Sequence, residues 1–174
     1  ASALANRLSP LLAPMVAALQ DTGPFISDAK SSGSRALKLA ALSYLTLLDD
    51  GKAASRAFAS ADNMSDQQGA LSALLDTGRG QRELNSFAAR WSDDRLVMDK
   101  WFALQVAYAA PDATFDTADR LTKHSAFDWK NPNRFRSVIG ALSGNHAGFH
   151  HASGASYRLL ADWQPDDGRT VFVV

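Results

Sequence analysis

Hydrophobic residues recur along most of this chain at steps of three and four, which is the period of an amphipathic α-helix. The clearest case follows Asp94, where Val97, Trp101, Leu104 and Tyr108 share one helical face. Alternation with period two occurs only in the tail 170–174, which is too short to build a sheet. The pattern therefore predicts an all-α chain.

Start and stop signals divide the pattern into six to eight short helices. Asn63, Asp94 and Asn131 stand where a side chain can cap the next helix, and the glycines at 51, 78 and 80 are typical of helix ends. The expected helices cover residues 35–48, 52–61, 63–77, 82–91, 95–110, 112–124, 132–144 and 155–163. Such short links predict helices in antiparallel pairs, stacked in a superhelical array like HEAT or armadillo repeats.

The first of these helices has an apolar face. Leu37, Ala41, Tyr44, Leu45 and Leu48 follow one another at helical steps, and Asp49-Asp50-Gly51 then ends the helix. This short link predicts that the next helix packs antiparallel to it.

Charge and composition exclude several classes of partner. The chain has 174 residues with 18 basic and 18 acidic side chains, so it has no surplus of positive charge for nucleic acid. It has no cysteine, which excludes disulfides and thiolate metal sites. The apolar segment 4–19 contains Arg7, Pro10 and Pro14 and reads as neither membrane anchor nor signal peptide. We expect a cytoplasmic protein, and the first residue is not Met, so we expect a piece of a longer chain.

No complete catalytic or metal centre can be assembled from the motifs. His146 and His150 have the i, i+4 spacing of a zinc pair, but Ala147 occupies the position where a zinc peptidase needs glutamate as its general base. No acidic third ligand follows closely. In the run 140–144, Ser143 stands one place too late for a Gly-x-Ser-x-Gly nucleophile. We predict no catalytic residue and no metal ligand in this chain.

One polar cluster is richer than a helix cap requires. Asn131-Pro132-Asn133-Arg134-Phe135-Arg136 places two arginines and two asparagines at the start of a helix. Free amides there favour anionic or carbonyl ligands, and arginine binds carboxylates through two parallel hydrogen bonds. We predict that Asn133, Arg134 and Arg136 include a ligand contact or a contact to another domain.

Several segments together resemble the C-terminal helical domain of bacterial aminopeptidase N, a zinc peptidase with a thermolysin-like catalytic domain. They are Gly33 to Leu45, the run 61–66 (Ala-Asp-Asn-Met-Ser-Asp), the run 99–105 (Asp-Lys-Trp-Phe-Ala-Leu-Gln), the run 131–140 (Asn-Pro-Asn-Arg-Phe-Arg-Ser-Val-Ile-Gly) and Phe149 to Tyr157. The resemblance covers about residues 20–162.

The resemblance implies that this chain is inactive alone and covers the catalytic domain of the same enzyme, where zinc is held by residues absent here. It also implies that the domain restricts peptide access to an active-site chamber, and that Arg134 or Arg136, with Asn133, contacts the peptide substrate distal to the cleaved bond. No cofactor is expected in this chain, and no nucleic acid or membrane as partner.

The resemblance weakens at two places. The run 153–157 is Ser-Gly-Ala-Ser-Tyr where the family has Asp-Gly-Ser-Gly-Tyr, and Pro165 and Gly168 should end the array where further helices are expected. We therefore predict one helical-repeat domain over 1–162 and an irregular tail over 163–174. The alternative to a peptidase domain is a freestanding helical-repeat scaffold that binds a protein partner through a concave face.

Overall fold

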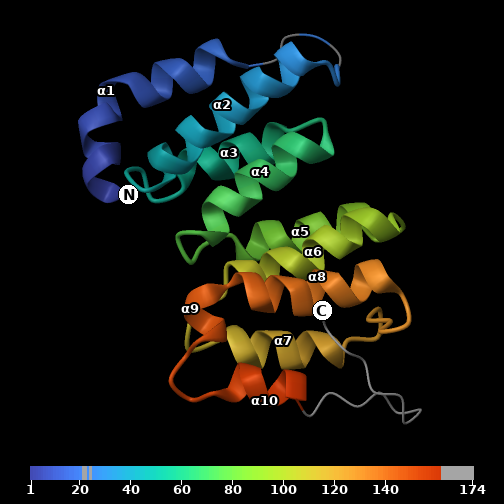
Figure 1. Cartoon of the computed structure of the whole chain (residues 1–174). Helices are drawn as coiled ribbons and strands as arrows, with labels where there is room; N and C mark the ends of the chain where they lie inside the picture. The colour runs from blue at the N-terminus through green and yellow to red at the C-terminus, as the bar shows by residue number, and fades with distance from the viewer. Residues whose placement is uncertain (21–22, 24, 162–174) are drawn as a thin grey trace. The chain divides into compact units, whose positions relative to one another are not determined.

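The computed structural model describes residues 1–20, 23 and 25–161, and every regular element in these ranges is an α-helix (Figure 1). The predicted all-α class is confirmed. The helices are α1 (Ser2–Ala18), α2 (Ala29–Thr46), α3 (Lys52–Ser60), α4 (Met64–Leu75), α5 (Gln81–Trp91), α6 (Arg95–Ala107), α7 (Thr114–Thr122), α8 (Pro132–Gly144), α9 (His146–Phe149) and α10 (Ala155–Ala161).

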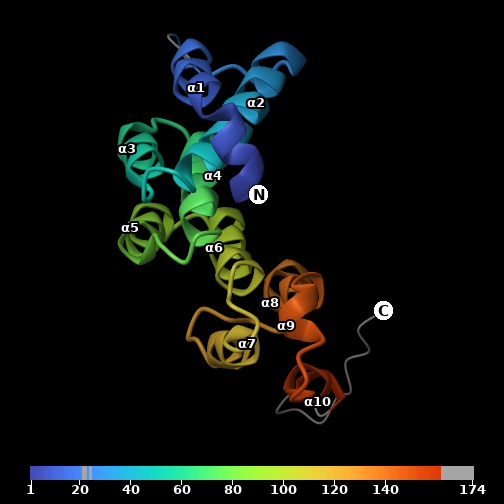
Figure 2. The same cartoon turned by 90° about the vertical axis from the view of Figure 1, so that its left-hand side faces the viewer.

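The chain divides into two compact units, Ala1–Phe87 and Ala88–Val174, with the boundary inside α5. In the first unit α2 packs against α1, α3 and α4. In the second unit α6, α7 and α8 contact one another, as Figure 2 shows from a direction nearly along these helices. The single domain over 1–162 stays a prediction, and the predicted tail 163–174 lies outside the described residues.

Three helices begin at the capping residues that the sequence predicts. Asn63 Oδ1 accepts a hydrogen bond from the Asp66 amide at 2.9 Å, and Asp94 Oδ1 accepts from the Leu96 amide at 3.0 Å. Asn131 Oδ1 accepts from the Asn133 amide at 3.0 Å. In each case a side-chain oxygen satisfies an amide that has no partner within its own helix, so local sequence alone fixes the helix start.

The helix ends predicted at glycine are also confirmed. Gly51, Gly78 and Gly80 have φ values of 82°, 70° and 89°, in the left-handed region that residues with a Cβ rarely adopt. At Gly80 the constraint is also steric, because a Cβ there would lie 2.8 Å from the Cβ of Leu74. The chain therefore turns where only glycine fits without strain.

The core of the second unit contains most of the apolar residues that the helical period selects, together with Phe102 and Val106 of α6, which lie outside the predicted face and are fully buried. Buried side chains from three helices meet there: Val97, Trp101 and Leu104 of α6, Ala118 and Leu121 of α7, and Phe135, Val138, Ile139 and Leu142 of α8. Tyr108 is an exception, because it follows the last residue of α6 and its side chain is 37% exposed.

The apolar face predicted for α2 is only partly buried. Ala41 is buried, but Leu37 is 50% exposed, whereas the neighbouring Lys38 is only 5% exposed. The Lys38 ammonium pairs with the Asp66 carboxylate of α4 at 3.0 Å. The buried side of α2 is therefore rotated from the predicted face by one residue, which is about 100° around the helix.

Two helices were missed by the sequence reading. α1 continues through Pro10 and Pro14 and buries Ala5 and Leu12. α9 is a single turn that follows α8 directly, so the glycine that ends α8 conceals it. Among the described helices, none combines the length and the apolar character that crossing a membrane requires.

Candidate functional site

The polar cluster at the start of α8 divides into one buried and two exposed side chains. Arg134 is buried, with 7% of its side chain exposed, whereas Asn133 and Arg136 are exposed. The reason is helical geometry: positions 133 and 136 share a face, and position 134 points toward α6. From the sequence, all three residues were predicted to belong to one contact site.

Arg134 is held by partners from two segments of the second unit, α6 and the loop between α7 and α8. Its Nε donates to the carboxylate of Asp99 on α6, one terminal nitrogen donates to the Ala126 carbonyl, and the other donates to the Arg95 carbonyl at 3.3 Å. Its guanidinium carbon lies 4.6 Å from the centre of the Phe102 ring. The guanidinium is therefore engaged on its edge and on one face within the domain.

The Phe102 ring that Arg134 covers packs against two further aromatic rings. Phe102 meets Trp101 edge to face at 5.0 Å between ring centres, and the His124 ring lies 5.4 Å from Phe102 and 5.5 Å from Trp101. Such contacts each add to the stabilisation that burial of the rings provides. Arg134 thus holds the start of α8 against the start of α6.

A second polar contact fixes the other end of α8. The Asn145 side-chain amide donates to the carbonyls of Val106 at 3.0 Å and Ala109 at 2.9 Å, near the end of α6. The start of α8 is held near the start of α6 and its end near the end of α6, so the two helices run parallel. Side chains on their common outer face therefore keep a fixed spacing.

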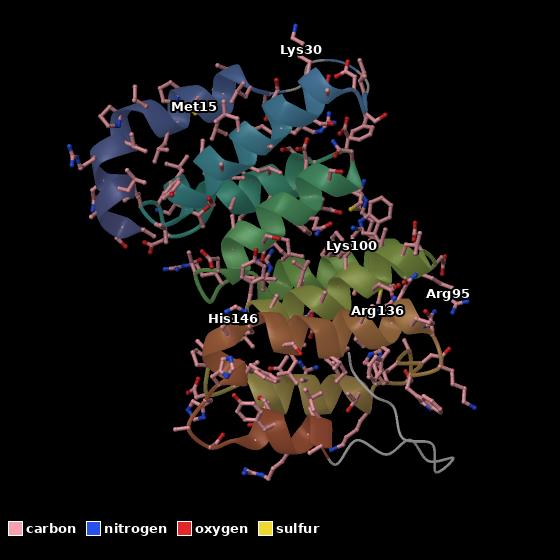
Figure 3. The ribbon with its side chains drawn as sticks, viewed as in Figure 1. Met15, Lys30, Arg95, Lys100, Arg136 and His146 are labelled. Atoms are coloured by element: carbon pink, nitrogen blue, oxygen red, sulfur yellow. The ribbon has the colours of Figure 1, made fainter. Side chains whose placement is uncertain are left out.

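Asn133 and Arg136 line a shallow depression of 430 Å³ on α6 and α8. The α6 side of the depression is formed by Leu96, Asp99, Lys100 and Ala103. Figure 3 labels Lys100 and Arg136 in this region of the second unit. Lys100 and Leu96 were not predicted as site residues, although positions 96, 99, 100 and 103 have the spacing of a single helical face, which was the available signal.

The depression is suited to binding rather than to bond cleavage. Lys100 and Arg136 contribute positive charge, and the carboxylate of Asp99 is already paired with Arg134. Asn133 adds an amide that both donates and accepts hydrogen bonds. This combination favours a carbonyl or carboxylate group, and its six lining residues contain no nucleophile beside a general base.

The histidine pair with zinc spacing lies on α9 and directly after it. The His146 and His150 rings lie 6.3 Å apart, and His150 contacts the Tyr157 hydroxyl through Nδ1. Among the described residues, no three His, Cys, Asp or Glu side chains gather closely enough to hold a metal ion.

Comparison with known proteins places the chain in a family. Residues 1–164 match the family described as a domain of unknown function (DUF3458_C) with ARM repeats. The chain is 38% identical over 165 residues to aminopeptidase N of Caulobacter vibrioides, covering 91% of the chain and 19% of that protein. It is 36% identical over 132 residues to aminopeptidase N of Haemophilus influenzae, covering 74% of the chain and 15% of that protein.

A third relative and a solved structure agree. Aminopeptidase N of Escherichia coli is 38% identical over 115 residues, covering 64% of the chain and 13% of that protein. The crystal structure of Legionella pneumophila aminopeptidase A in complex with aspartic acid superposes with a TM-score of 0.79 at 29% identity, over 92% of this chain and 20% of that one. The chain thus spans less than a fifth of the curated relatives' length. It belongs to the DUF3458_C ARM-repeat family and is a C-terminal helical domain of the aminopeptidase N type.

Proposed function

We propose that this chain is the part of a cytoplasmic zinc aminopeptidase that caps the catalytic domain and restricts peptide access to its active-site chamber. The catalytic domain of the same enzyme would supply the zinc and the reacting groups, and this chain alone would be inactive. The similarity to three aminopeptidases N, each matched over less than a fifth of its length, supports this proposal. Because these relatives carry the region within a longer chain, they favour a peptidase domain over a freestanding scaffold.

The proposed contact with the peptide is made by Arg136 and Asn133. The observation that carries it is the depression in which these two exposed residues stand with Lys100 on parallel, mutually fixed helices. A peptide carbonyl or terminal carboxylate distal to the cleaved bond matches its donors and its positive charge. Arg134, the third predicted residue, is proposed to act as a positioning residue, since its donors are engaged with Asp99 and two carbonyls.

Access restriction is tested in the full-length enzyme that contains this domain. Three substrates share one N-terminal sequence: a pentapeptide, a small protein in its folded state, and the same protein unfolded by reduction of its disulfides. We expect the enzyme to release the first residue from the pentapeptide and the unfolded protein, and not from the folded protein, because a chamber excludes a folded body. Equal release rates from the folded and unfolded forms would contradict the capping role.

A further inference from the structure

The depression on α6 and α8 has a surplus of positive charge that a contact with a neutral peptide carbonyl does not use. Of its six lining residues, Lys100 and Arg136 carry positive charge and Asp99 carries negative charge. The Asp99 carboxylate is already paired with Arg134, which is buried in the second unit. The depression therefore holds two positive charges that its own carboxylate does not balance.

Neither of these two cations has a partner in the part of the chain that the structure describes. The ion pairs and hydrogen bonds between described side chains leave out the Lys100 ammonium and the Arg136 guanidinium. By contrast, the exposed cations Arg79 and Lys123 pair with carboxylates at 2.9 Å and 2.6 Å. Two cations that line one depression repel each other, and an anion bound between them removes this repulsion.

A carboxylate fits the two cations better than a carbonyl does. One of its oxygens can accept from the planar donors of Arg136 while the other accepts from the Lys100 ammonium. A carbonyl has one oxygen and no net charge, so it would leave the surplus of positive charge in place. In a peptide, a carboxylate comes from the chain end or from an acidic side chain, and every unmodified peptide has the former whatever its sequence.

We propose that Lys100 and Arg136 together bind the C-terminal carboxylate of the peptide substrate. Lys100 is then a specificity-determining residue, and the preferred substrate class is peptides with a free C-terminus over peptides with an amidated one. This inference rests on the proposed peptide contact and narrows that contact from any distal carbonyl or carboxylate to the end of the peptide chain.

The test uses the full-length enzyme that contains this domain and two pentapeptides of one sequence, ending in leucine as the free acid or as the amide. We expect kcat/KM to be about ten- to a hundredfold higher for the acid. Lys100→Met keeps the aliphatic stem and Arg136→Gln keeps neutral donors, and each should lower the acid-to-amide ratio at least about threefold. The double variant should bring the ratio close to one. Lys52→Met, at an exposed position of α3, is the control and should leave the ratio unchanged.

A third pentapeptide distinguishes the two sources of a carboxylate. It is amidated and ends in glutamate, and we expect it to be cleaved as slowly as the leucine amide. The acid-to-amide ratio of the unmodified enzyme should also fall as salt is added, because the depression is shallow and its charges are screened by ions.

Equal kcat/KM values for the acid and the amide, a ratio that neither variant changes, or a glutamate amide as good as the free acid would overturn the proposal. An aminoacyl anilide separates these outcomes from failure of the peptide contact itself. If the variants weaken the acid and the amide equally and spare the anilide, the depression holds the peptide but not its end. If they change all three substrates alike, the proposed peptide contact is wrong as well.

Discussion

Asp99 and Arg134 stand 35 residues apart in the chain and form an ion pair inside the second unit, with side chains 14% and 7% exposed. The pair joins α6 to the first turn of α8. It explains why one arginine of the Asn-Pro-Asn-Arg-Phe-Arg run is buried while the next, Arg136, remains at the surface. The spacing of these residues in the sequence contains no sign of this division, because the partner lies on another helix.

Arg134→Ala should destabilise the chain by about 3–5 kcal/mol, because it leaves the Asp99 carboxylate buried without its cation. The measurement is the free energy of unfolding in urea. A double change to Arg134→Met and Asp99→Leu should lose less stability than Arg134→Ala alone, since no unpaired charge remains. The control is Lys123→Ala, which breaks an exposed pair with Asp119 and should cost under about 1 kcal/mol. Similar losses for Lys123→Ala and Arg134→Ala would contradict this account.

Trp101→Ala should cost about 3–5 kcal/mol through the cavity it creates. The Trp101 side chain is among the buried core of the second unit and contacts the rings of Phe102 and His124. Leu96→Ala on the same helix is the control, because Leu96 is 66% exposed and its loss should change stability by under about 0.5 kcal/mol. A Trp101→Ala variant as stable as the Leu96→Ala variant would place this ring outside the core.

Local chemistry accounts for what the sequence predicted well. A cap such as Asn63 bonds an amide three residues later, and a glycine such as Gly78 turns the chain by itself, so both signals are complete within a few residues. Most apolar core positions of α6 and α8, such as Val97, Trp101 and Val138, follow from the helical period because aliphatic and aromatic side chains recur there at steps of three and four.

Long-range pairing accounts for what the sequence did not predict. Lys38 is buried by an aspartate 28 residues away, so the lysine reads as exposed and the face of α2 is misplaced. At the candidate site, Arg134 is likewise buried by an aspartate that is distant in the sequence, Asp99. Lys100 enters the site only because α8 lies parallel to α6, an arrangement that depends on contacts such as those of Asn145.

Gly148→Ala should strongly destabilise the turn α9. A Cβ at Gly148 would lie 2.0 Å from Oγ1 of Thr114, whose hydroxyl is already bonded to the Ala110 carbonyl at 2.8 Å. Because α7 and α9 must separate to admit the methyl group, we expect a loss of about 1–3 kcal/mol. Gly144→Ala is the matched control, since nothing lies within 4 Å of a Cβ there, and it should be neutral or slightly stabilising. Thermal unfolding of both variants measures the difference, and equal melting temperatures would contradict the steric argument.

Asp28 caps the start of α2, and its titration should lower the stability of the chain at acid pH. The pKa of Asp28 lies below its usual 3.8 because the carboxylate accepts hydrogen bonds from Ser31, first from its backbone amide at 2.7 Å and then from its side chain. A lowered folded-state pKa means that the ionised cap stabilises the fold above pH 3.8, and that this contribution is lost as pH falls through the lower, folded value.

Asp28→Asn separates this titration from all others, because asparagine caps a helix equally well and carries no proton equilibrium. The difference in melting temperature between the two proteins should be constant above about pH 5 and should shift in favour of Asp28→Asn between about pH 4 and pH 2. Other carboxylates titrate in both proteins and cancel. A difference that stays constant down to pH 2 would show that Asp28 has the same pKa in the folded and unfolded chain.

Arg136→Ala, made in the full-length enzyme that contains this domain, should discriminate between substrates by length. If the guanidinium holds a carbonyl or carboxylate distal to the cleaved bond, kcat/KM for a pentapeptide should fall about ten- to a hundredfold. An aminoacyl anilide does not extend that far and should be hydrolysed at nearly the original rate. Arg136→Lys should recover only part of the loss, because the charge remains while the planar pair of donors is gone.

Two further variants complete the test of Arg136. Arg82→Ala removes an exposed arginine of the first unit and should leave all substrates unaffected. Arg134→Ala should lower stability and should reduce kcat/KM for the pentapeptide more than for the anilide, because it moves the start of α8 and with it Arg136, which only the pentapeptide reaches. If Arg136→Ala reduces both substrates equally, then Arg136 serves the fold or a domain interface, and the depression on α6 and α8 does not select peptides by length.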